Sequence, residues 1–132
     1  MGADFVALIP SDNEARMSYS YVHVIRGKLI KMVDKKLGEY FGDLPPGKSL
    51  SLAYNRSIQE LEEMVDASGD DIIRGVLAFV NHSDCDGMFY DDCECILKAL
   101  KKLAETDDDE VVENLIKVFD DAVSKGGIVA IW

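Results

Sequence analysis

Short apolar runs stand near both ends of the chain, and both are typical of buried β-strands. The first run, residues 4–9, stops at Pro10, just before the turn residues Ser-Asp-Asn. The second run, residues 128–132, is mostly β-branched and follows Gly126 and Gly127. Two such short strands would each be unstable alone. We therefore expect them to pair side by side in one small sheet, with helices covering at least one of its faces.

Between these ends, apolar residues recur three and four positions apart, as on the buried side of an amphipathic helix. The spacing predicts one helix over residues 22–41, which ends before a Pro-Pro-Gly linker. It predicts further helices that start near Ser57, Asp70, Cys93 and Thr106. The starts at Ser57 and Thr106 each match the capping-box pattern, in which two side chains satisfy free backbone N–H groups.

These elements predict an α+β fold that is mainly helical and forms a single domain over residues 1–132. We expect four or five helices to pack on a small sheet formed by the N- and C-terminal strands. A chain of 132 residues is long enough for one such core and short for two. The residues expected in the core are Phe5, Leu8, Leu29, Val33, Leu77, Val80, Leu97, Leu100, Leu115 and Phe119.

The charge of the chain is strongly negative and unevenly distributed. The sequence has 25 acidic and 14 basic residues, a net charge of −11. Residues 1–56 hold six acidic and eight basic residues, a net charge of +2, whereas residues 57–132 hold nineteen acidic and six basic ones, a net charge of −13. Because nucleic-acid binding requires a basic face, we expect no direct binding to nucleic acid.

The acidic excess of the second part has two interpretations. Acidic helices on their own keep a protein soluble, with no partner involved. Alternatively, rows of carboxylates on helices imitate the phosphates that a nucleic-acid-binding site expects, and they speed association with a basic protein partner, for example a nucleic-acid-handling enzyme. The partner-binding residues expected in that case are exposed acidic residues, namely Glu62, Glu63, Asp66, Asp70, Asp71, Asp91, Asp92, Asp107, Asp108, Asp109 and Glu113.

One segment between two predicted helices resembles a calcium-binding EF-hand loop. With Gly87 at the turn position, Asp84 and Asp86 occupy positions where liganding carboxylates belong. The first and last positions, however, hold His82 and Cys93, where calcium requires an Asp and a bidentate Glu. The loop therefore lacks two of the oxygen ligands that calcium needs.

A zinc site is the other metal-binding interpretation of this segment, since His82, Cys85 and Cys93 have the residue types that zinc prefers. No CxxC pair is present in the sequence, and Cys93 and Cys95 would point about 200° apart on a helix. The alternative is that the aspartates make turn hydrogen bonds and the cysteines pack as small hydrophobes. We expect no metal and no cofactor; if the loop binds an ion, the candidate ligands are His82, Asp84, Cys85, Asp86 and Cys93.

The remaining features point away from an enzyme and a membrane protein. His23 lies in a run of aromatic and β-branched residues, which favours a packed or surface histidine over a catalytic base. Gly126 and Gly127 follow a helix, where a C-cap is expected, and do not precede one as in a phosphate-binding loop. The sequence has no apolar run long enough to span a membrane, and its three cysteines suit a reducing compartment. We expect a cytoplasmic protein that does not bind membranes.

Three motifs in the chain carry a resemblance to a group of known proteins. They are GxDF followed by SDNE at residues 2–5 and 11–14, HSDCDG at 82–87, and Gly-Gly at 126–127 before the last strand. In these motifs the chain resembles a loose group of small, mostly uncharacterised bacterial and phage proteins. The resemblance implies a stand-alone protein of phage, mobile-element or bacterial origin. In that setting an acidic protein would inhibit a defence protein by occupying its basic surface, and the alternative is an ion- or small-ligand-binding protein that uses the loop from His82 to Cys93.

Overall fold

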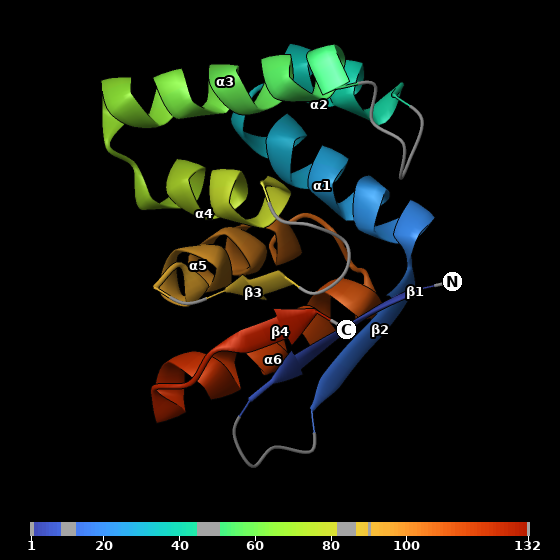
Figure 1. Ribbon diagram of the computed structural model, residues 1–132, viewed down its shortest axis with the longest axis vertical. Helices are drawn as coiled ribbons and strands as arrows, with labels where there is room; N and C mark the ends of the chain where they lie inside the picture. Colours follow the sequence, from blue (N-terminus) through green and yellow to red (C-terminus); the bar gives the residue numbers. More distant parts are fainter. Residues whose placement is uncertain (1, 9–12, 45–50, 82–86, 90, 132) are drawn as a thin grey trace.

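A computed structural model of the chain describes residues 2–8, 13–44, 51–81, 87–89 and 91–131. These residues form a four-stranded antiparallel sheet and six helices, so the mainly helical α+β fold predicted from the sequence is confirmed (Figure 1). The prediction of four or five helices was too low. The elements in chain order are β1 (Gly2–Ala7), β2 (Glu14–Ser18), α1 (Tyr19–Val33), α2 (Lys35–Gly42), α3 (Ser51–Ser68), α4 (Asp71–Val80), β3 (Gly87–Phe89), α5 (Cys93–Ala104), α6 (Glu110–Lys125) and β4 (Val129–Ile131).

The two terminal strands pair with each other, as predicted. Phe5 of β1 lies opposite Ile131 of β4 in an antiparallel register. Two unpredicted strands flank this pair, which makes the strand order β2-β1-β4-β3. In β2, Ala15 and Met17 are buried while the residues between and beside them face solvent. The sheet therefore has one face that packs on helices, and α6 lies directly behind its strands in Figure 1.

The single helix predicted over residues 22–41 is in fact two helices, α1 and α2. Asp34 separates them, because its backbone is extended, with φ of −143° and ψ of 111°. Its side chain accepts the backbone N–H of Leu37 at 2.9 Å and so caps the start of α2. Gly38 lets α2 pack closely against α1, since a Cβ atom at this position would overlap the backbone of Lys31. The chain thus folds α2 back against α1.

Neither predicted capping box starts a helix. Ser57 lies inside α3 and is fully buried, so it caps nothing. Thr106 lies in the turn after α5, and the residue that caps α6 is Asp109. The C-cap predicted at Gly126 is confirmed by its left-handed backbone, with φ of 67°. None of the helices in the described ranges is long and apolar enough to span a membrane.

The core is a single cluster of buried side chains that every helix and strand described above contributes to. Four aromatic rings lie near its centre, with centroids between 5.3 and 6.4 Å apart, from Phe5, Phe79, Phe89 and Phe119. They connect the sheet to α4 and α6. Their burial favours folding because apolar surface leaves water.

Most of the predicted core residues are buried, but three are not. Val33 and Leu77 are half-buried, and Leu8 is 42% exposed. Successive side chains of a strand point to opposite faces, so Leu8 faces away from the core when Phe5 and Ala7 face it. The remaining predicted core residues are confirmed as buried, namely Phe5, Leu29, Val80, Leu97, Leu100, Leu115 and Phe119.

Candidate functional site

The eleven acidic residues predicted to bind a partner fall into two groups with different surroundings. The first group, which we call the α3–α5 acidic surface, consists of Glu62, Glu63, Asp66, Asp70, Asp71, Asp91 and Asp92, and all of them are exposed. The second group lies around the start of α6 and consists of Asp107, Asp108, Asp109 and Glu113. In this second group Asp107 and Asp109 are half-buried.

Helix α3 carries the largest part of the α3–α5 acidic surface. It runs along the outside of the molecule above α4 in Figure 1, and its residue Leu61 is buried in the core. Glu62, Glu63 and Asp66 lie on the opposite, solvent-facing side. Glu62 and Asp66 are one turn apart, about 6 Å along the helix axis. They therefore form a row of carboxylates that a flat partner surface can contact.

The starts of α4 and α5 extend this acidic surface. Asp70 caps α4 by accepting a backbone N–H of the first turn at 2.7 Å. Asp71 pairs with Lys98 of α5 at 2.9 Å, which lowers the pKa of the Asp71 carboxyl. Burial raises the pKa of the Cys95 thiol, and the negative charges of Asp71 and Asp92 raise it further. The Asp71–Lys98 ion pair joins the start of α4 to α5, and a Cβ atom at Gly75 would overlap the backbone of Cys95, so the first turns of the two helices lie close together.

Several carboxylates of the acidic surface have no side-chain partner among the residues that the structure describes. The side chains of Glu62, Asp66, Asp91 and Asp92 make no hydrogen bond or ion pair with any described residue. A charge without an internal partner needs no contact to be broken before it meets an opposite charge on another molecule. These four residues are therefore the best suited of the group to bind a basic surface.

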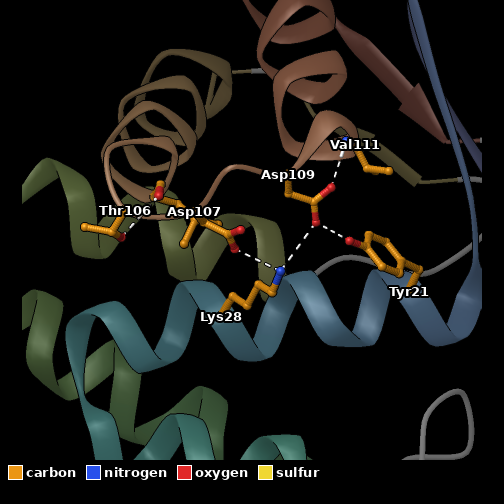
Figure 2. A network of polar contacts seen from close by, with 7 residues as sticks. Tyr21, Lys28, Thr106, Asp107, Asp109 and Val111 are labelled. Carbon is orange, nitrogen blue, oxygen red and sulfur yellow. Dashed lines mark hydrogen bonds and ion pairs between the residues drawn. The ribbon is translucent and has the colours of Figure 1, made fainter.

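Asp107 and Asp109, by contrast, point inward toward α1, as Figure 2 shows. The Lys28 Nζ atom lies 2.8 Å from the Asp107 carboxylate and 3.4 Å from that of Asp109. Tyr21 donates its phenolic O–H to Asp109. The other carboxylate oxygen of Asp109 accepts the backbone N–H of Val111 at 2.9 Å. We call this network the α1–α6 clamp, because Tyr21 and Lys28 hold α1 to the start of α6.

The pKa shifts in the α1–α6 clamp stabilise the charge states that these groups have at neutral pH. The hydrogen bond to Asp109 raises the pKa of Tyr21, and the one to Asp107 raises the pKa of Lys28. Burial opposes ionisation of Asp109, but the hydrogen bonds from Tyr21, Val111 and Lys28 outweigh it and lower the pKa of Asp109. The clamp is thus a structural contact, and the prediction that Asp107 and Asp109 are exposed was wrong.

The candidate metal ligands are mostly outside the described residues, namely His82, Asp84, Cys85 and Asp86. Cys93 is described and is buried, and its thiol donates a hydrogen bond to the Phe89 carbonyl oxygen at 3.4 Å. Burial raises the pKa of the Cys93 thiol, which disfavours the thiolate that binds zinc. Within the described ranges, no three His, Cys, Asp or Glu side chains are grouped so that they could hold a metal ion.

A hollow lies between α1 and α2, apart from the α3–α5 acidic surface. The sequence pattern did not predict it. Its volume is about 510 Å³, and His23 lines it. The His23 ring stacks on Phe41 of α2, with centroids 4.6 Å apart. Burial lowers the pKa of His23, so the ring is neutral at neutral pH. His23 is thus a half-buried, packed histidine, one of the two placements predicted from the sequence, and its position beside a hollow depends on the fold of α2 against α1.

Comparisons of the chain with protein-family models, with curated proteins and with solved structures found no match. The resemblance to small bacterial and phage proteins therefore stays a prediction.

Proposed function

We propose that this protein is a small, acidic, non-enzymatic binding protein of the cytoplasm. Its α3–α5 acidic surface would occupy a basic surface on a protein partner. The observation that supports this most is the contrast between the two acidic groups. All seven residues of the first group are exposed, whereas Asp107 and Asp109 of the second are used inside the molecule.

The local balance of charge supports the same proposal. Between Glu62 and Lys98 the chain has only two basic residues, Arg74 and Lys98. Lys98 lies 2.9 Å from Asp71 and 3.9 Å from Glu94, so its charge is already shared. A surface with so few cations has a negative field that attracts a basic partner and speeds the encounter.

A protein that handles nucleic acid is the class of partner that fits this surface best. Its phosphate-binding site is basic and accepts rows of negative groups. If the resemblance to phage and bacterial proteins is correct, the partner would be a nuclease or another defence protein, and this chain would be its inhibitor. The acidic surface would then compete directly with nucleic acid.

Two variants with equal charge changes test the proposal. The first, E62Q/E63Q/D66N, neutralises the row on α3, and the second, D108N/E110Q/E113Q, neutralises three exposed residues near the start of α6. Each variant and the wild type would capture proteins from a bacterial lysate at low salt, followed by quantitative mass spectrometry. We expect the wild type and the α6 variant to retain a basic, nucleic-acid-handling protein that the α3 variant loses. Equal capture by both variants, or no basic protein at all, would contradict the proposal.

A further inference from the structure

The hollow between α1 and α2 has the size of a small-molecule site. Its volume of about 510 Å³ lies within the range usual for ligand pockets. It is separate from the α3–α5 acidic surface, since its walls come from α1, from α2 and from the residue that ends α2. The lining residues used below are His23, Gly27, Lys31, Glu39, Gly42 and Asp43. We call it the α1–α2 hollow.

Two glycines in this lining are not required by packing. A Cβ atom at Gly27 would make ordinary contacts at 3.8 Å, and one at Gly42 would meet no atom of a described residue within 4 Å. Gly38 and Gly75 are different, because a Cβ atom there would overlap the backbone of a neighbouring helix. Glycine makes a helix less stable than alanine does. The fold alone therefore does not account for Gly27 and Gly42, whereas an open hollow does, since side chains at both positions would narrow it.

The charges around the α1–α2 hollow do not neutralise one another. Among the described residues, Lys31, Glu39 and Asp43 make no ion pair and no side-chain hydrogen bond. Lys28 also lines the hollow, but its ammonium group belongs to the α1–α6 clamp. His23 is neutral at neutral pH, because burial lowers its pKa. Among the described residues that line the hollow, one free cation and two free anions remain, which gives a net charge of −1.

We infer that the α1–α2 hollow binds a small molecule with two cationic groups, one anionic group and an aliphatic stem, the pattern of a free basic amino acid. The anionic group would face Lys31, and the cationic groups would face Glu39 and Asp43. The C-terminal carbonyl groups of α2 also favour positive charge there. Val24, which is 43% exposed and lines the same hollow, offers an apolar contact to the stem.

Isothermal titration calorimetry with L-arginine and L-lysine tests this inference. We expect saturable one-to-one binding of at least one of them, and weaker binding of norleucine, which lacks the second cation, and of arginine methyl ester, which lacks the anion. Glu39→Gln and Asp43→Asn should each weaken binding about tenfold, equivalent to about 1.4 kcal/mol. The matched control Glu14→Gln, which removes the same charge at an exposed position of β2, should bind as the wild type does. Absence of saturable binding by both amino acids, or unchanged binding by the Glu39 and Asp43 variants, would overturn the inference.

The variants Gly27→Ala and Gly42→Ala test the reason given for the two glycines. Both should fold with a melting temperature at or above that of the wild type, because the added methyl group meets no backbone atom of a described residue closer than 3.8 Å. Both should bind the amino acid more weakly, because the methyl group occupies part of the hollow. A lower melting temperature in both variants would show that the glycines serve packing, and undiminished affinity would show that the ligand lies elsewhere; either result would overturn the inference.

Discussion

Replacing Asp109 by alanine removes three interactions of the α1–α6 clamp at once. Loss of the helix cap on the Val111 N–H costs about 1 kcal/mol. The half-buried Tyr21 hydroxyl loses its acceptor, at a further cost of about 1–2 kcal/mol. Lys28 keeps Asp107 at 2.8 Å and is one-third exposed, so the broken ion pair adds at most about 0.5 kcal/mol. We expect the free energy of unfolding to fall by about 2–3 kcal/mol.

Urea denaturation followed by far-UV circular dichroism measures this change at neutral pH. Asp109→Asn separates the contributions, because asparagine caps a helix as well as aspartate does but has no charge. It should lose only about 1 kcal/mol, because its amide oxygen keeps the Val111 cap, and its NH2 group takes the place of the oxygen that accepts from Tyr21 and can donate to the tyrosine hydroxyl instead. Asp108→Ala, at an exposed neighbouring position, serves as the control and should change stability little.

The pH dependence of the same measurement follows from the lowered pKa of Asp109. A carboxyl group whose pKa lies lower in the folded state stabilises the fold above its unfolded pKa, near 3.8, and loses this effect as the pH falls through the folded value. The difference between wild type and Asp109→Asn should therefore shrink below about pH 4. A loss in Asp109→Ala of less than about 0.5 kcal/mol, the usual size for an exposed position, would refute the assignment of Asp109 to a clamp.

Three further predictions concern the core and the cysteines. Gly75→Ala should lower stability by about 1–3 kcal/mol in urea denaturation, because its Cβ atom would overlap the backbone of Cys95; unchanged stability would contradict the close approach of α4 and α5. Cys93 should resist alkylation by iodoacetamide in the native protein and react after unfolding, as read by peptide mass spectrometry, since it is buried and its thiol pKa is raised. Because Cys93 faces the core, EDTA should leave the melting temperature unchanged, and a large decrease would restore the metal-binding interpretation of the loop from His82 to Cys93.

The hydrophobic pattern of the sequence predicts the long helices and the terminal strands but fails at short elements and at breaks. Strand β2 has only two apolar side chains, Ala15 and Met17, and β3 has three residues in all, so neither shows a clear period. The hydrophobic pattern does not show the break between α1 and α2 for a different reason. Leu37 and Phe41 continue the helical spacing across Asp34, while the break itself comes from the extended backbone and cap at Asp34.

The sequence indicates which acidic residues belong to the candidate site, but it does not indicate which of their side chains are exposed. Asp107, Asp108 and Asp109 are equivalent in sequence, and only the fold makes them different. Tyr21 and Lys28, which engage two of them, lie 88 and 81 residues earlier than Asp109 in the chain. Nothing local to the acidic run indicates which of its members will meet that tyrosine and lysine. The exposed row on α3 could be predicted better, since Glu62, Glu63 and Asp66 lie opposite the apolar side of their own helix.

Displacement of DNA tests most directly whether the α3–α5 acidic surface occupies the nucleic-acid-binding surface of a basic partner. The purified partner would be bound to a fluorescent duplex and titrated with wild type, with E62Q/E63Q/D66N and with D108N/E110Q/E113Q. We expect the wild type and the α6 variant to displace the duplex alike. The α3 variant should require at least about tenfold more protein for the same displacement. Added salt should weaken displacement steeply, because it screens exposed charges beyond a Debye length of about 10 Å at 0.1 M. A complex that contains partner, duplex and this protein together, or equal displacement by all three proteins, would contradict the claim.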